Sequence, residues 1–152
     1  ASIRAGLLKE ALLDGRTDSL RYTPSDTAWM KELEVFTKLD EINKPVNKQN
    51  YTVRDGVADA GSNLTIKEFA CIGELPIVYL KIYYQGNLKK PRKIEALYDE
   101  RNLLYKSARF LSMHFQQIDN KTVLTSYAVR GGQKMIFGDS VAFYVSGKIL
   151  VD

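Results

Sequence analysis

Apolar and polar residues alternate through most of the chain after residue 50, and this pattern predicts β-strands. Residues 75–85 carry apolar side chains at both even and odd positions, which suits a strand in the middle of a sheet. The segment 141–149 alternates cleanly, with Val141, Phe143 and Val145 on one side. Turn residues recur about every 8–12 residues, a spacing typical of a β-meander. The second part of the chain is therefore expected to form an antiparallel sheet.

The remaining strands of this sheet are expected between Gly, Asn and Asp turn signals. They are placed at 51–54, 64–71, 122–130 and 133–137. Gly131 and Gly132 are expected to form a tight hairpin turn between the last two, and Gly138 and Asp139 a turn before 141–149.

The first 43 residues follow a helical pattern instead. A short helix is expected at 3–14, closed by Gly15, and a polar connection follows at 16–22. Thr23 is expected to cap a second helix, because Pro24 fits the first turn and an acidic residue follows. The apolar side of that helix consists of Trp29, Leu33, Phe36 and Leu39, and Lys44-Pro45 is expected to end it.

The segment 92–117 is compatible with two structures. At helical spacing its apolar residues form one stripe, interrupted by Arg101. At a spacing of two, its residues form two strands that would turn at 99–102. A helix of this length is long against a mean of about 11–12 residues, and Lys90-Pro91 offers no good N-cap, so a hairpin is favoured. A long central helix at 92–118 remains the alternative.

Composition places the chain among ordinary globular domains. It has 152 residues, is 45% hydrophobic and carries a net charge of +4. We expect a single domain over 1–152, with a helical part at 1–43 and an antiparallel sheet at 50–150. The mild, interspersed charge excess does not favour nucleic-acid binding. No apolar run reaches the ~18 residues of a membrane span, and the single Cys71 excludes an intramolecular disulfide.

Residues with catalytic potential are few. His114 is the only histidine and has no adjacent nucleophile motif. Glu95, Asp99 and Glu100 could form a carboxylate pair, but neighbouring residues on a strand point apart, so a solvated hairpin tip is favoured. No metal site, cofactor or catalytic residue is predicted.

The nine tyrosines are the most informative polar-aromatic set. Interleaved with basic residues, they could line a face that binds a sugar, an aromatic group or a lipid head group. Strands also favour Tyr for packing alone, because its ring is buried while its hydroxyl reaches water. The candidate ligand-binding residues are Tyr83, Tyr98, Tyr105, Arg109 and Lys134.

Four stretches of the sequence carry a resemblance that covers nearly the whole chain. They are LLKEALLDGRTDSL, INKPV, KIEALYDERNLLYKSARFL and SYAVRGGQKMIFGDSVAFYVSG. They resemble a group of uncharacterised exported proteins of Bacteroidetes-type bacteria. The resemblance implies a periplasmic or cell-envelope location, with a lipidated N-terminus as one option, and implies no activity.

These observations favour an α+β, mostly β fold, in which two N-terminal helices pack on a curved, half-barrel-like antiparallel meander. The first functional hypothesis is a non-enzymatic envelope domain whose concave sheet face binds an apolar or amphipathic ligand, such as a lipid, or an envelope protein partner. The second is a structural or assembly module that acts through a protein interface. The third is a small carboxylate-dependent enzyme using Glu95, Asp99 and Glu100.

Overall fold

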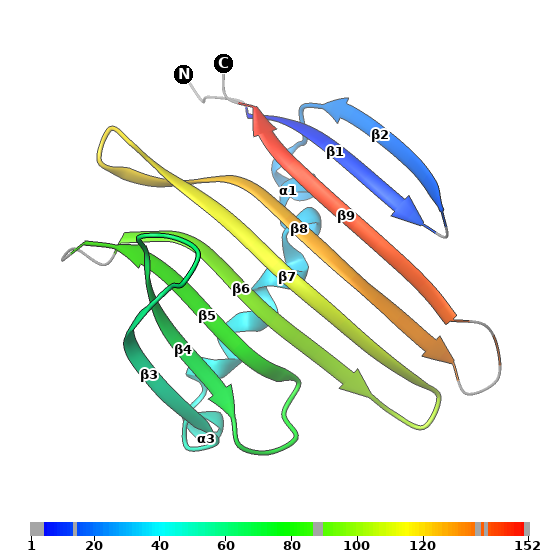
Figure 1. Cartoon of the computed structure of the whole chain (residues 1–152). Helices are drawn as coiled ribbons and strands as arrows, with labels where there is room; N and C mark the ends of the chain where they lie inside the picture. The colour runs from blue at the N-terminus through cyan, green and yellow to red at the C-terminus, as the bar shows by residue number, and fades with distance from the viewer. Residues whose placement is uncertain (1–4, 14, 87–89, 136–137, 139, 151–152) are drawn as a thin grey trace.

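The protein is a nine-stranded antiparallel sheet with one helical segment on one of its faces (Figure 1). The computed structural model describes residues 5–13, 15–86, 90–135, 138 and 140–150. The strand order is β2-β1-β9-β8-β7-β6-β5-β4-β3, so every neighbouring pair is consecutive in the chain except β1 and β9, and β2 and β3 lie at the two edges. The first and last strands of the chain therefore join two meanders into one sheet.

The strands and helices have the following bounds. The strands are β1 (Gly6–Leu13), β2 (Arg16–Tyr22), β3 (Tyr51–Ala58), β4 (Thr65–Cys71), β5 (Ile77–Gln85), β6 (Lys90–Arg101), β7 (Tyr105–Ile118), β8 (Lys121–Met135) and β9 (Ser140–Leu150). The helical segment contains α1 (Asp26–Glu32), α2 (Glu34–Thr37), the 3-10 helix η1 (Lys38–Asn43) and α3 (Pro45–Lys48).

The helical segment crosses the sheet diagonally on a single face (Figure 1). Its first helix begins at Ser25, whose side chain accepts a hydrogen bond from the backbone N–H of Ala28. Phe36 and Ile42 are buried in one core cluster with strand residues that include Leu7, Ala96 and Leu111. The core therefore lies between the helical segment and the sheet.

A polar network inside this core ties α1 to the sheet. The hydroxyl of Tyr127 donates a hydrogen bond to Glu32 at 2.6 Å, and Lys9 forms an ion pair with the same carboxylate at 2.9 Å. The Tyr127 ring also packs edge-on against Phe36, with the ring centroids 5.8 Å apart. Gly147 faces this ring, and a Cβ there would lie within 2.5 Å of the Tyr127 hydroxyl oxygen. The absence of a side chain at Gly147 makes room for the network.

The mostly β fold expected from the sequence is confirmed, and so is the central hairpin. Residues 92–118 form β6 and β7, which pair from Lys93 with His114 to Arg101 with Lys106. The turn lies just after the expected position, because the side chain of Asn102 accepts hydrogen bonds from the backbone N–H groups of Leu104 and Tyr105. A single long helix at 92–118 is thereby excluded.

The helix expected at 3–14 is wrong, because described residues 6–13 form a strand. Residues 16–22, expected to be a polar connection, form the second strand of the same hairpin, and Gly15 turns it at a φ of +82°. β1 pairs with β2 on one side and β9 on the other, which buries Leu7 completely. Pairing along both edges outweighs the local helical pattern.

Two further boundaries differ from expectation. Gly131 and Gly132 form no turn, because β8 runs through them to Met135. A Cβ at Gly131 would overlap the carbonyl oxygen of Ala108 on β7, so this glycine permits a close approach of two strands. Pro45 does not end the helical segment but occupies the first turn of α3. The turn expected at Gly138 and Asp139 lies partly outside the described residues.

Candidate ligand-binding face

One face of the sheet carries the helical segment, and no helix formed by the described residues lies over the opposite face (Figure 1). Strand register decides which side chains lie on this open face, since alternate residues point to opposite sides. Residues directly opposite each other across neighbouring strands line up into rows that run across the sheet. Three such rows can be traced without interruption from β4 to β2.

The aromatic row contains the larger apolar side chains of the open face. Its members pair in sequence across six strands: Tyr79, Leu97, Phe110, Arg130, Tyr144 and Leu12. With neighbouring strands about 4.8 Å apart, the row is roughly 24 Å long. Tyr144 and Leu12 are 38% and 41% exposed, so apolar surface is open to solvent at the β9–β1 end.

The mixed row comes next; it has acidic residues at its two ends and small side chains in its middle. It contains Glu68, Lys81, Glu95, Ser112, Ala128, Ser146 and Glu10.

The basic row follows, and among its described members no acidic residue occurs. It contains Tyr83, Lys93, His114, Ser126, Lys148, Leu8 and Arg21. The open face thus changes from apolar to cationic over two steps.

Three cations on this face lie over aromatic rings. Lys81 lies 5.3 Å from the ring centroid of Tyr79, and Lys93 lies 5.0 Å from that of Tyr83. The guanidinium of Arg130 lies 5.5 Å from the ring of Phe110. Such contacts stabilise a cation that keeps one side towards solvent. They hold positive charge close to apolar surface.

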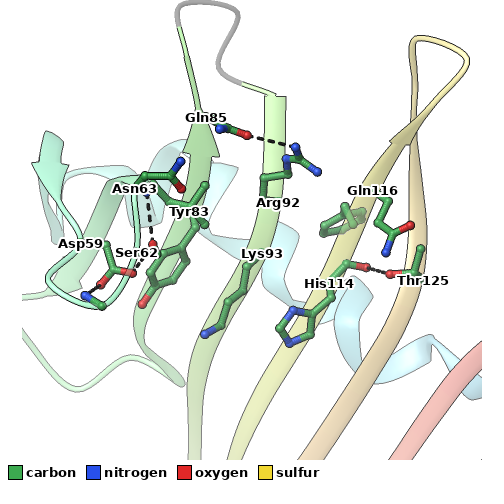
Figure 2. Close-up of a pocket in the computed structure, with 13 residues that line it drawn as sticks. Asp59, Ser62, Asn63, Tyr83, Gln85, Arg92, Lys93, His114, Gln116 and Thr125 are labelled. Carbon is green, nitrogen blue, oxygen red and sulfur yellow. Dashed lines mark hydrogen bonds between the residues drawn. The ribbon is translucent and has the colours of Figure 1, made fainter.

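A pocket of about 720 Å³ opens at one end of the basic row (Figure 2). The loop after β3 supplies one wall, β5 and β6 supply the floor, and β7 and β8 supply the far wall. Asp59 fixes the loop by accepting hydrogen bonds from the Ser62 hydroxyl at 2.7 Å and the Gly61 N–H at 3.4 Å. These bonds, with the Ser62 contribution largest, lower the pKa of the Asp59 carboxyl.

Tyr83, Glu95 and Lys93 form a linked group at the floor. The Tyr83 hydroxyl donates to Glu95 at 3.0 Å, and Lys93 forms an ion pair with the same carboxylate at 2.6 Å. Burial, reinforced by the bond to Glu95, raises the pKa of Tyr83. The tyrosine therefore stays protonated, and the lysine is partly neutralised.

Arg92 lies above Lys93 on β6, and His114 lies beside Lys93 on β7, in the same pocket (Figure 2). Arg92 donates a hydrogen bond to the side-chain oxygen of Gln85 at 3.0 Å, so its partner is neutral. His114 is held in place through its backbone carbonyl, which accepts from the Thr125 hydroxyl at 3.2 Å. Burial and the charge of Lys93 lower the pKa of the His114 imidazole.

The five residues predicted to bind ligand do not share one surface. Register places Tyr98, Tyr105 and Arg109 on the helix side, and Tyr83 and Lys134 on the open face. Only Tyr83 of the five lines the pocket described above. The role of the five in ligand binding stays a prediction.

On the helix side, Tyr98 and Arg109 are cross-strand partners within the sheet. Lys38 of the 3-10 helix lies 5.3 Å from the buried ring of Tyr98, and the guanidinium of Arg109 lies 5.9 Å from the ring of Phe143. The Nε of Arg109 is buried with no hydrogen-bond partner among the described residues. The side chains of Tyr98 and Arg109 are therefore positioned by packing against other residues of the same protein.

The three acidic residues considered for catalysis are separated as well. Glu95 is occupied by Tyr83 and Lys93, whereas Asp99 forms an ion pair with Arg101 at 3.1 Å. Glu100 follows Asp99 on the same strand and therefore points to the opposite face. Asp99 and Glu100 both line a pocket of about 370 Å³ next to residues 73–78, but the Asp99 carboxylate there is paired with Arg101, and Glu95 is not among the lining residues.

Sequence reasoning missed the aromatic row, the basic row and the loop at 59–64. The rows include Leu8, Leu12 and Arg21, which come from segments interpreted as a helix and a connection, so their alternation was not used. The pocket depends on register between four strands, and no local pattern reveals it. Residues 16–22 carry apolar side chains only at Leu20 and Tyr22, so no local pattern reveals the first hairpin either.

Comparison with known proteins gives no further assignment: no family model matches, and neither does any curated protein or solved structure at a significant level. Among the described residues, no helix is long and apolar enough to cross a membrane.

Proposed function

We propose that this protein is a non-enzymatic binding module whose open sheet face holds an amphipathic ligand. The observation that carries the proposal is the order of the rows on that face. An apolar, aromatic row and a cationic row run in parallel, and on β7, β8 and β9 only small side chains separate them. Charge complementarity favours a ligand with an apolar chain and an anionic group, because the basic row has no acidic member among its described residues.

The dimensions of the face fit such a molecule. Adjacent rows are about 6.7 Å apart along a strand. Because the mixed row lies between them, the aromatic and basic rows are roughly 13 Å apart. The middle of the mixed row consists of Ser112, Ala128 and Ser146, which leave little side-chain volume between them. A ligand could therefore contact both rows at once. The half-barrel-like curvature expected from the sequence belongs to the proposal.

The periplasmic or cell-envelope location belongs to the proposal too. It is supported by the resemblance of the sequence to exported proteins of Bacteroidetes-type bacteria. Fractionation of the native cells tests it directly: we expect the protein with the periplasm or envelope, and recovery in the cytosol would contradict this part.

Binding is tested with dansyl-labelled undecanoic acid, whose fluorescence rises when the probe leaves water. Leu12 and Leu13 provide a matched pair, since they are neighbours on β1, are 41% and 52% exposed and point to opposite faces. We expect Leu12→Ser to weaken binding about fivefold, which corresponds to roughly half the transfer free energy of a leucine side chain. Leu13→Ser should leave the affinity unchanged.

The same experiment distinguishes the competing functions. Equal effects of the two substitutions, or no binding by the wild-type protein, would contradict the proposal. Concentration-dependent elution in size-exclusion chromatography that Leu12→Ser abolishes would instead assign the aromatic row to an interface between copies, and would also contradict it.

A further inference from the structure

The pocket beside the loop at 59–64 has cationic groups without acidic partners. Arg92 binds the neutral side chain of Gln85, and no ion pair to Arg92 is found within the described part of the chain. The His114 imidazole makes no hydrogen bond there either, although its backbone carbonyl does. Both side chains line the pocket wall. Their donors are therefore available to a ligand.

The acidic groups near the pocket are already occupied. Asp59 accepts hydrogen bonds from Ser62 and Gly61, and Glu95 accepts one from Tyr83 and pairs with Lys93. An anion that entered the pocket would meet carboxylates whose charge is partly balanced. It would also meet the guanidinium of Arg92, which has no acidic partner among the described residues, and the ionisable imidazole of His114.

The pocket is continuous with the basic row rather than separate from it. Tyr83, Lys93 and His114 belong to both, and they pair directly with one another from β5 to β7. The aromatic row passes the same three strands at Tyr79, Leu97 and Phe110, two rows away. An apolar chain on that row and a polar group in the pocket would be separated by roughly 13 Å.

We infer that this pocket is the subsite for the anionic head group of the amphipathic ligand, with Arg92 and His114 as its principal donors. The inference rests on the proposed function and adds the chemical class of the head group. The guanidinium of Arg92 offers a planar fork that matches a carboxylate or phosphate. His114 contributes a second positive charge when it is protonated.

Protonation of His114 makes the preference depend on pH. The groups that face its ring are Lys93 on β6, which lowers its pKa, Glu95 on the same strand, which opposes that effect, and the uncharged Ser126 on β8. A bound anion favours the imidazolium form. Affinity for an anionic probe should therefore rise as pH falls through the His114 pKa, which lies below its ordinary value.

The test compares two probes that differ only in the head group: dansyl-labelled undecanoic acid and the corresponding dansyl-labelled undecyl alcohol. The wild-type protein should prefer the acid, and Arg92→Gln should reduce that preference about tenfold, the effect of losing a charge-assisted hydrogen bond. Its affinity for the alcohol should not change. Lys106→Gln is the control, because it removes one positive charge from the same face outside the pocket and outside the three rows, and it should keep the preference. His114→Gln should remove the pH dependence of the preference for the acid probe.

Each outcome has one meaning. If neither probe binds, the proposed function fails. If both bind equally and Arg92→Gln changes neither, the head-group subsite is wrong while the proposed function stands. Titration with inorganic phosphate alone distinguishes a free anion from a head group: we expect weak binding, and phosphate binding as tight as that of the acid probe would overturn the inference.

Discussion

Replacing Gly147 by alanine tests how the helical segment is fixed to the sheet. The added Cβ would lie within 2.5 Å of the Cε1 and hydroxyl oxygen of Tyr127, whereas ordinary contacts begin at 3.4 Å. The ring must therefore move by about 1 Å. Such a movement lengthens the 2.6 Å hydrogen bond from Tyr127 to Glu32 beyond hydrogen-bonding distance.

The expected cost follows from two contributions. Overpacking a well-filled core costs about 1–3 kcal/mol, and losing a hydrogen bond to a charged acceptor costs about 1.5–3 kcal/mol. The lower entropy of the unfolded alanine chain offsets about 0.4–1 kcal/mol. Gly147→Ala should therefore lower the free energy of unfolding by about 2–4 kcal/mol, which corresponds to roughly 5–15 °C in Tm for a chain of this size.

Urea denaturation followed by circular dichroism measures this change. In a Tyr127→Leu background the ring is absent, so the additional cost of Gly147→Ala should fall below about 0.5 kcal/mol, as a double-mutant cycle detects. An unchanged urea midpoint for Gly147→Ala, or the same cost in both backgrounds, would refute the proposed packing of Tyr127 against Gly147.

Two further predictions concern other parts of the sheet. Gly131→Ala should destabilise the protein by about 3 kcal/mol or more, because the added Cβ would overlap the backbone of Ala108. Gly132→Ala should cost about 1 kcal/mol or less, because its Cβ would meet only one oxygen, at 3.3 Å. Equal thermal midpoints for the two variants would contradict the close approach of β7 and β8. Burial raises the pKa of Tyr51 from 10.0 to about 12, and its hydroxyl donates to the Ile77 carbonyl at 2.8 Å. The stability that the protonated Tyr51 contributes is complete below pH 10 and is lost as pH rises through 12. The difference in unfolding free energy between the wild type and Tyr51→Phe should therefore shrink over that interval. A constant difference in alkaline denaturation curves would argue against a buried tyrosine.

The mostly β fold was predictable because alternation and turn residues agree over most of the chain after residue 50. The hairpin of β6 and β7 was favoured because a helix there would be unusually long and would lack a good N-cap, and the structure adds that Asn102 forms the turn through its own side chain. Local chemistry alone decides such features. They can therefore be recognised in one sequence.

The first hairpin could not be predicted in the same way. The sequence of β1 fits a helix as well as a strand, and it becomes a strand because β9, about 130 residues later, pairs with it from Gly6 to Leu13. The glycines at 131 and 132 are ambiguous for a related reason, since a turn and a close strand approach both require a missing side chain. Contacts distant in sequence decide both cases.

The candidate site was only partly predictable. Tyr83 was a candidate because of its residue type, and its neighbours Arg92 and His114 join it in the pocket only through the register of β5, β6 and β7. Tyr98 and Arg109 have suitable chemistry on the opposite face. Residue type therefore identified candidates, and only the register separated those that share a surface.

The central claim is that the helix-free face, and not the helix side, holds an amphipathic ligand. Amide chemical-shift mapping of the protein saturated with dansyl-labelled undecanoic acid tests this most directly. We predict that the shifts concentrate on the open-face positions of β5–β9 and β1, from Phe110 and Tyr144 to His114. Shifts confined to the helical segment and to the residues that face it, such as Phe36 and Tyr127, would contradict the account.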